Sequence, residues 1–221
     1  MLTAAAHVHL TEDMALALLA RRDLPASAIE LLARNRGVIQ QRKVLAQIIR
    51  HPNTPRHVAL PLLRRLFVFE LMEIALAPAV AADLKLPAEG LLIDKLENIS
   101  LGEAISLARR ASAGVAGALL LKPDRAVIEA ALQNPRMTEA NIVKALSAKE
   151  VPALLITMLS HDAKWSLRRE IQTAILRRPE AEAGVVRKIA DNLPKPAIYE
   201  ILNSIRLLHR REELLRSLLE R

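Results

Sequence analysis

The second half of the chain repeats part of the first half. Residues 10–62 align with residues 137–189 without a gap, and twelve aligned positions are identical. We call this the internal alignment. The identities include the pairs Thr11/Thr138, Glu12/Glu139, Pro25/Pro152 and Pro52/Pro179. Threonine caps and prolines have fixed places at helix ends, so their coincidence indicates two copies of one structural unit. Internal repeats of this kind are typical of repeat architectures.

Signals for helix starts divide the chain into shorter units. They recur at Thr11, Thr54, Ser100, Thr138 and Ala181, at spacings of 43, 46, 38 and 43 residues. Ser100 followed by Glu103 is a capping-box pattern. A period near 43 residues is that of HEAT and armadillo repeats. The sequence therefore predicts about five repeats, starting near residues 11, 54, 100, 138 and 181.

Each repeat is predicted to contain three short helices. In the repeat near residue 138, Ile142, Val143 and Leu146 form an apolar stripe on the first helix, and Pro152 opens the second. The third is predicted over about residues 164–177, with Leu167 and Ile171 on its apolar stripe. The repeat near residue 11 follows the same scheme. Its third helix carries a stripe of Val44, Leu45, Ile48 and Ile49.

Composition supports an all-helical fold, because apolar residues make up 52% of the chain and most of them are Ala and Leu. No single repeat of this size buries its apolar face alone, so the repeats must stack. We therefore predict one all-α domain over residues 1–221, a right-handed α–α superhelix of about five three-helix HEAT/armadillo-like repeats. Residues 205–221 are predicted to form a C-terminal capping helix, with a partner-binding amphipathic helix as the alternative.

Three short motifs mark the ends of predicted helices. They are Asn-Pro-x-x-Thr-Glu at residues 134–139, His-Pro-Asn-Thr-Pro at residues 51–55 and Lys-Trp-Ser-x-Arg at residues 164–168. Their arrangement resembles that of uncharacterised bacterial α-helical repeat proteins near the HEAT-like and leucine-rich-repeat-variant groups. The resemblance implies a helical solenoid and brings no agreed activity. Some leucine-rich-repeat-variant proteins carry an iron–sulfur cluster on cysteines, and this chain has no Cys.

The sequence lacks the spacings that several kinds of chemistry need. Without Cys there are no disulfides or thiolate metal sites, and none of the six His residues forms the i, i+4 pair of a helical zinc site. There is no Gly-rich phosphate loop and no Gly-x-Ser-x-Gly motif. We therefore predict no catalytic residue, no metal and no cofactor, and a protein that is not an enzyme. In the internal alignment His51 matches Arg178, which favours a surface or loop position for His51.

The location of the protein is predicted from what the chain lacks. Glu12 and Asp13 come early, which argues against a signal peptide, and residues 66–84 carry too many charges to span a membrane. The absence of Cys suits a reducing compartment. We therefore expect a cytoplasmic protein.

The basic residues are the feature with functional potential. The formal net charge is +8, which favours polyanions or acidic protein surfaces as partners, although a solvated basic surface is equally consistent. In armadillo-type solenoids the third helix lines the concave groove. By that analogy we predict a ladder of binding residues: Arg42, Lys43, Arg50, Lys164, Arg168, Arg169 and Arg177. Adjacent residues on a helix point about 100° apart, so the alternative is that they lie on convex or lateral faces.

Two functions are consistent with this sequence. The first is a non-enzymatic scaffold that binds an unidentified protein, because helical repeats provide extended surfaces. The alternative is sequence-independent binding of nucleic acid or another polyanion through a basic face. Aromatic residues that stack on bases are almost absent. The sole tryptophan, Trp165, aligns with Val38, which favours packing over contact with a base.

Overall fold

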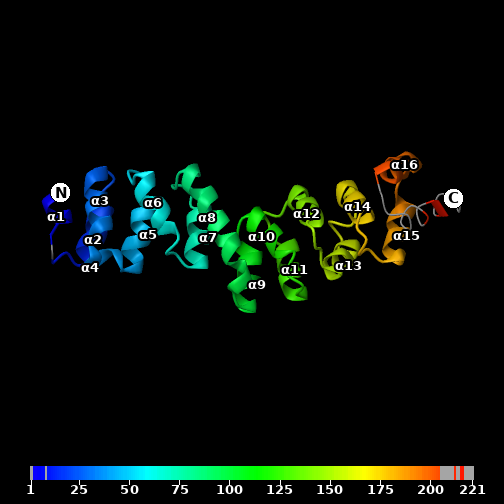
Figure 1. The fold of residues 1–221 in the computed structure, drawn as a ribbon, viewed down its shortest axis with the longest axis horizontal. Coiled ribbons are helices and arrows are strands. Elements are labelled where there is room, and N and C mark those ends of the chain that lie inside the picture. The colour runs from blue at the N-terminus through cyan, green and yellow to red at the C-terminus, as the bar shows by residue number, and fades with distance from the viewer. Residues whose placement is uncertain (1, 8, 205–211, 213–214, 217–221) are drawn as a thin grey trace. The chain divides into compact units, whose positions relative to one another are not determined.

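The computed structural model describes residues 2–7, 9–204, 212 and 215–216. Within these residues the chain forms sixteen α-helices and one 3₁₀ helix, and no strand (Figure 1). The all-α prediction is therefore confirmed for this part of the chain. No helix in it is long and apolar enough to cross a membrane. Most of the predicted capping helix over residues 205–221 lies outside the described residues.

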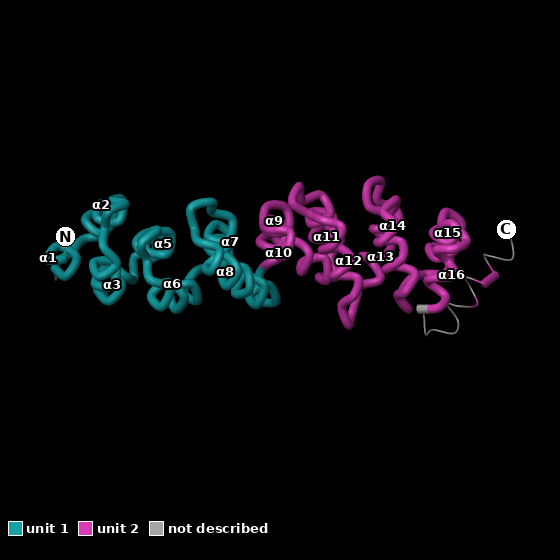
Figure 2. Tube along the Cα trace, turned by 90° about the horizontal axis from the view of Figure 1, so that it is seen from above, with its two compact units in different colours: residues 1–99 teal, residues 100–221 magenta. Residues whose placement is uncertain are grey.

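The chain divides into two compact units, Met1–Ile99 and Ser100–Arg221, which Figure 2 draws in teal and magenta. The division falls immediately before the cap of α9. There the Ser100 hydroxyl accepts a hydrogen bond from the Glu103 backbone N–H, and the Glu103 carboxylate accepts one from the Ser100 N–H. Both halves of the predicted capping box are therefore present. The two units are described separately.

Unit 1 consists of two layers of short helices. Its helices are α1 (Leu2–Ala5), α2 (Glu12–Leu19), α3 (Ala26–Arg34), α4 (Arg36–Ile39), α5 (Arg42–Arg50), α6 (Arg56–Leu63), α7 (Val68–Leu76), α8 (Ala82–Lys95) and the 3₁₀ helix η1 (Leu96–Asn98). In one layer α2 contacts α5 and α5 contacts α7, while in the other α1 contacts α3 and α6 contacts α8. The layers meet where α5 packs on α6 and α7 on α8.

Unit 2 repeats this two-layer packing. Its helices are α9 (Leu101–Arg110), α10 (Ala113–Leu119), α11 (Arg125–Leu132), α12 (Glu139–Leu146), α13 (Ala153–His161), α14 (Arg169–Leu176), α15 (Ala183–Asn192) and α16 (Lys195–Ser204). One layer runs through α9, α11, α13 and α15, and the other through α10, α12 and α14. Between α10 and α12, a Cβ at Gly117 would lie only 3.3 Å from that of Asn141. The glycine thus permits this close approach.

Five pairs of helices begin at the offset of the internal alignment. In unit 1, α2, α3, α5, α6 and α7 begin at residues 12, 26, 42, 56 and 68. In unit 2, α12, α13, α14, α15 and α16 begin at residues 139, 153, 169, 183 and 195. The correspondence extends beyond residue 62, where the internal alignment ends, to the pair α7 and α16.

The spacing of helices within a layer is shorter than the period predicted from the capping signals. In unit 2, α10, α12 and α14 begin at residues 113, 139 and 169. The predicted starts near residues 11, 54 and 100 lead into α2, α6 and α9, and α2 and α6 belong to different layers. Successive starts in the predicted period therefore belong to helices that do not occupy equivalent positions in the packing. Capping signals locate helix starts but not the layer that each helix joins.

The predicted third helix over about residues 164–177 is shorter in the structure. Helix α14 begins at Arg169, and residues 163–167 form a turn. The Asp162 carboxylate holds this turn by accepting hydrogen bonds of 2.8 Å from the backbone N–H groups of Lys164 and Trp165. Leu167 is 77% exposed, so its predicted place on the apolar stripe was wrong. An Asx turn offers the backbone an alternative to the helix.

Trp165 belongs to the core. Its ring is buried, and its indole N–H donates a hydrogen bond of 3.2 Å to the Leu132 carbonyl. Val38, its counterpart in the internal alignment, is also buried. The burial of Trp165 supports a role in packing, which the sequence favoured over contact with a base.

Polar side chains link each helix pair to the preceding one. Buried Asn134 donates to the carbonyls of Ala108 (2.8 Å) and Ala111 (3.1 Å). Asn53 donates to the carbonyls of Arg22 and Leu24 in the same way. His51 lies in the loop after α5, one of the two positions expected for it, but it is buried rather than at the surface, and its ring is 2.9 Å from the Arg21 carbonyl. These links satisfy carbonyl groups that would otherwise lack partners near helix ends.

Candidate binding groove

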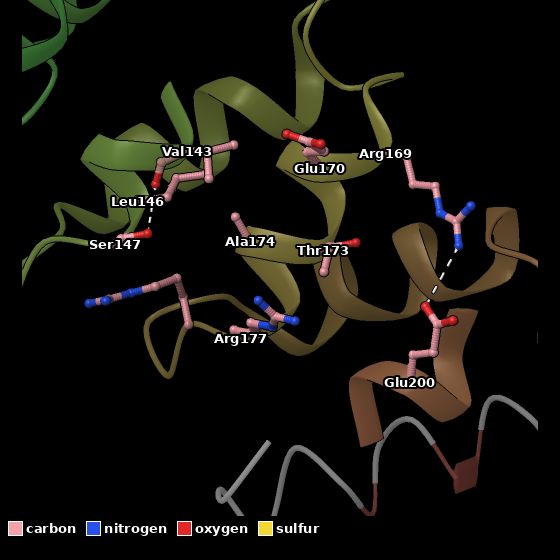
Figure 3. Close-up of a pocket in the computed structure, with 10 residues that line it drawn as sticks. Val143, Leu146, Ser147, Arg169, Glu170, Thr173, Ala174, Arg177 and Glu200 are labelled. Carbon is pink, nitrogen blue, oxygen red and sulfur yellow. Dashed lines mark hydrogen bonds and ion pairs between the residues drawn. The ribbon is translucent and has the colours of Figure 1, made fainter. Parts of the chain in front are cut away.

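A groove of about 620 Å³ lies in unit 2 along α12, α14 and α16 (Figure 3). Its lining residues are Val143, Leu146, Ser147, Arg169, Glu170, Thr173, Ala174, Arg177, Arg178 and Glu200. We call this the α14 groove, because α14 and the residues that follow it supply most of its lining. Among the predicted binding residues, Arg169 and Arg177 line it.

The lining of the α14 groove combines aliphatic and polar side chains. Val143, Leu146 and Ala174 supply aliphatic surface. In Figure 3, Thr173 and Ala174 lie between the side chains of α12 and the Arg169–Glu200 pair. Protein interfaces likewise combine apolar surface with polar and charged side chains.

Arg169 and Arg177 are spaced along one side of α14. They lie eight residues apart, slightly more than two helical turns, so their directions around the helix axis differ by about 80°. Arg169 faces Glu200 of α16 at 3.9 Å, and both side chains are largely exposed. Arg177 is exposed and has no ion-pair partner among the residues that the structure describes. Two guanidinium groups are thus weakly neutralised or not neutralised in the α14 groove.

Arg178, although adjacent to Arg177, has a structural role. Its guanidinium donates 2.9 Å hydrogen bonds to the Ala148 carbonyl and to the Glu180 carboxylate. Only 14% of its side chain is exposed. The hydrogen bond from Arg178 lowers the pKa of Glu180 below its ordinary value. Arg178 therefore lines the α14 groove with a guanidinium that is already bonded within the chain.

Unit 1 contains the counterpart of this arrangement, with both arginines paired with carboxylates. Arg42 corresponds to Arg169 and forms an ion pair with Glu70 of α7, while its Nη1 donates to the Arg65 carbonyl at 2.8 Å. Its guanidinium also lies 3.9 Å from the centre of the Phe67 ring. Arg50 corresponds to Arg177 and pairs with Glu73. In unit 1, two glutamates of α7 thus neutralise the two arginines of α5.

A single difference in sequence accounts for much of this contrast. At the offset of the internal alignment, Glu73 matches Glu200, but Glu70 matches Ala197. Ala197 is buried and carries no charge. At these two positions unit 2 therefore has one carboxylate where unit 1 has two, whereas Glu170 of α14 stands at the position of Lys43 and adds a carboxylate to the groove lining. The α14 groove keeps a cationic site for which the chain supplies no second carboxylate at the equivalent position.

The other predicted binding residues lie apart from the α14 groove. Arg42, Lys43 and Arg50 are in unit 1, where Lys43 is exposed. Lys164 is in the turn before α14, 3.9 Å from the centre of the Trp165 ring. Arg168 is the N-cap residue of α14 and is exposed, outside the groove lining.

Sequence reasoning missed the rest of the groove. Val143 and Leu146 were assigned only to an apolar stripe, and Thr173 and Glu200 were not singled out. The signal for Glu200 was present, because extending the internal alignment past residue 62 pairs it with Glu73.

Comparisons with known proteins add no assignment. No protein-family model, curated protein or solved structure matches this chain. Within the described residues, no group of three or more His, Cys, Asp or Glu side chains is placed to hold a metal ion. The geometry of the α14 groove is therefore the basis for a functional proposal.

Proposed function

We propose that this chain is a non-enzymatic helical-repeat scaffold that binds another protein in the cytoplasm through the α14 groove. The observation that carries this proposal is the open groove itself, whose lining combines aliphatic side chains with Arg169 and Arg177. Arginine is enriched at protein interfaces, where its planar fork binds carboxylates in pairs of hydrogen bonds.

The same proposal includes a right-handed α–α superhelix of the HEAT/armadillo type. The five pairs of helix starts at a shared offset and the two-layer packing within each unit support it. Carbonyl links such as Asn134 to Ala108 and His51 to Arg21 also support it, since each joins a helix pair to the preceding one. The short spacing of α10, α12 and α14 along one layer favours a repeating element of two helices rather than three. Such arrays expose long surfaces to partners.

Affinity capture with matched variants tests the scaffold. The full chain, an Arg169→Gln/Arg177→Gln variant and an Arg109→Gln variant are each immobilised and exposed to extracts of the cells that produce the protein. Arg109 is exposed near the end of α9 and is outside the groove lining, which makes it a suitable control. We expect one or more proteins to be retained by the wild type and by Arg109→Gln but lost with the groove variant. Equal recovery with all three proteins would reject the α14 groove as the binding surface.

Sequence-independent binding of nucleic acid is the second candidate function. Residues 100–221 hold 20 Lys and Arg against 14 Asp and Glu, whereas residues 1–99 hold 12 against 10. Arg168 and Arg177 are exposed and form no ion pair within the described part of the chain. This function requires duplex DNA or RNA to bind with steep salt dependence and to lose affinity in Arg168→Ala/Arg169→Ala. If micromolar protein at physiological salt fails to bind either nucleic acid, this candidate is eliminated.

A further inference from the structure

Corresponding arginines of the two units differ in their ion pairs, and this difference indicates which kind of ligand the α14 groove binds. In unit 1, Arg42 and Arg50 are both paired with carboxylates of α7, at Glu70 and Glu73. In unit 2, Arg169 faces the carboxylate of Glu200 at 3.9 Å, and Arg177 has no ion pair among the described residues. The position of the second carboxylate is occupied by Ala197. From this contrast we propose that the α14 groove binds an acidic segment of a partner protein, whose Asp or Glu carboxylates engage Arg169 and Arg177.

This inference rests on the proposed function and names the chemistry of the partner. The internal counterpart favours a carboxylate, because carboxylates are what the equivalent arginines bind in unit 1. Glu70 and Glu73 are three residues apart on one helix, so they lie on the same helical face. An acidic helix with carboxylates at this spacing reproduces the arrangement that engages Arg42 and Arg50.

The other residues of the groove suit a protein segment better than a nucleic acid. Val143, Leu146 and Ala174 offer aliphatic surface to apolar side chains. Glu170 and Glu200 also line the groove and repel any anion, so a continuous phosphate backbone suits it less well than a segment with a few spaced carboxylates. The Ser147 hydroxyl already donates to the Val143 carbonyl at 2.8 Å, so it is not a free donor for phosphate. A helix with a few acidic and several apolar side chains meets these conditions.

The test uses two synthetic helical peptides and the full chain. One fluorescent peptide is rich in Ala and carries Glu at three- and four-residue intervals, and the other has Gln at the same positions. Fluorescence anisotropy measures binding at low and at physiological salt. We expect the Glu peptide to bind the wild type and the Gln peptide to bind at least ~10-fold more weakly, the ratio that 1.4 kcal/mol produces. Arg169→Gln/Arg177→Gln should lose the preference for Glu, and Arg109→Gln should keep it.

A variant that supplies the missing carboxylate provides a second measurement. Thr173 lies one helical turn from both Arg169 and Arg177 and lines the groove. Thr173→Glu places a carboxylate between the two arginines and should abolish binding of the Glu peptide, whereas Thr173→Gln should retain it. Because both variants add nearly the same volume, a difference between them reports charge. Circular dichroism on both verifies that the chain is folded.

Each outcome decides the inference. Binding of the Glu peptide with the stated pattern of variants supports it. Absence of binding, equal binding of the Gln peptide, or displacement of the Glu peptide by duplex DNA that depends on the same arginines overturns it. The proposed function is tested separately, because cellular proteins captured in an Arg169- and Arg177-dependent manner would keep the scaffold even if the acidic peptide failed.

Discussion

The guanidinium of Arg178 donates a hydrogen bond of 2.9 Å to the backbone carbonyl of Ala148, thirty residues earlier in the chain. In unit 1 the ring of His51 lies 2.9 Å from the carbonyl of Arg21, also thirty residues earlier. His51 and Arg178 occupy corresponding positions in the internal alignment, and so do Arg21 and Ala148. Two different side chains thus make the same link. The position is constrained by the need to cap a carbonyl rather than by residue type.

Replacement of Arg178 should destabilise unit 2. Arg178→Ala leaves the Ala148 carbonyl and the Glu180 carboxylate without this donor, and we expect it to lower the free energy of unfolding by about 2 kcal/mol. Urea denaturation followed by circular dichroism measures the change. Arg177→Ala is the matched control, because the neighbouring arginine is exposed and a surface substitution typically changes stability by less than ~0.5 kcal/mol. Equal effects of the two variants would contradict a structural role for Arg178.

The Arg178–Glu180 pair should also make stability depend on pH. The hydrogen bond from Arg178 lowers the pKa of Glu180 in the folded protein. A carboxyl group with a depressed folded pKa stabilises the fold fully above its unfolded pKa, and this stabilisation is lost as the pH falls through the folded pKa. We therefore expect Glu180→Gln to be less stable than the wild type at neutral pH, with the difference disappearing in acid. Urea denaturation at a series of pH values measures the difference in unfolding free energy between the two proteins. A difference that does not change with pH would contradict the stabilising role of the Arg178–Glu180 pair.

The buried side chain of Asn134 should contribute strongly to the stability of unit 2. Its side chain is buried, donates to the carbonyls of Ala108 and Ala111, and accepts a hydrogen bond from the Arg136 N–H at 2.8 Å. Asn134→Ala leaves these buried groups unpaired, and we expect a loss of about 3 kcal/mol. Asn192→Ala is the control, since Asn192 is exposed and bonds to the Lys188 carbonyl within its own helix. A loss below that of the control would show that water replaces the side chain.

The sequence predicted helix starts accurately where a cap or a proline marks them. Thr11, Ser100 and Thr138 are N-caps in the structure, and Pro25 and Pro152 immediately precede α3 and α13. These signals are local, because a side chain bonds to a backbone N–H two or three residues away. The layer that a helix joins depends on contacts with distant residues, so the spacing within a layer was not predictable from caps.

The candidate site was only partly predictable for the same reason. Arg169 and Arg177 were identified, but so was Arg42, which the structure pairs with Glu70. A list of basic residues does not distinguish a guanidinium that meets a carboxylate from one that does not. That distinction depends on α7 and α16, which pack against neighbours from earlier in the chain.

Trp165 provides a spectroscopic test of its burial. It is the only tryptophan, so all tryptophan fluorescence reports its environment. Since its ring is buried, we expect blue-shifted emission, weak quenching by iodide, and a red shift on unfolding in urea. Saturating single-stranded DNA should leave the emission unchanged. Quenching by DNA together with strong iodide quenching would instead indicate an exposed ring that stacks on bases.

The ion pairs of the two units should differ in strength, and a double-mutant cycle measures this difference. The Arg42–Glu70 pair is partly buried, includes an additional bond to the Arg65 carbonyl and has Phe67 against the guanidinium, so we expect a coupling energy of about 1 kcal/mol. The Arg169–Glu200 pair joins two side chains that are 63% and 79% exposed at 3.9 Å, so we expect about 0.2 kcal/mol or less. Arg→Gln and Glu→Gln replacements, singly and together, give both energies from urea denaturation.

Added salt should increase the difference between the two coupling energies, because screening affects exposed charges most. The Arg42–Glu70 coupling should persist at high salt, and the Arg169–Glu200 coupling should fall to zero. A weak pair at Arg169 leaves its guanidinium available to a carboxylate from another protein. If instead the two cycles give equal coupling, Arg169 is as fully engaged as Arg42, and the α14 groove has no electrostatic advantage over its counterpart in unit 1.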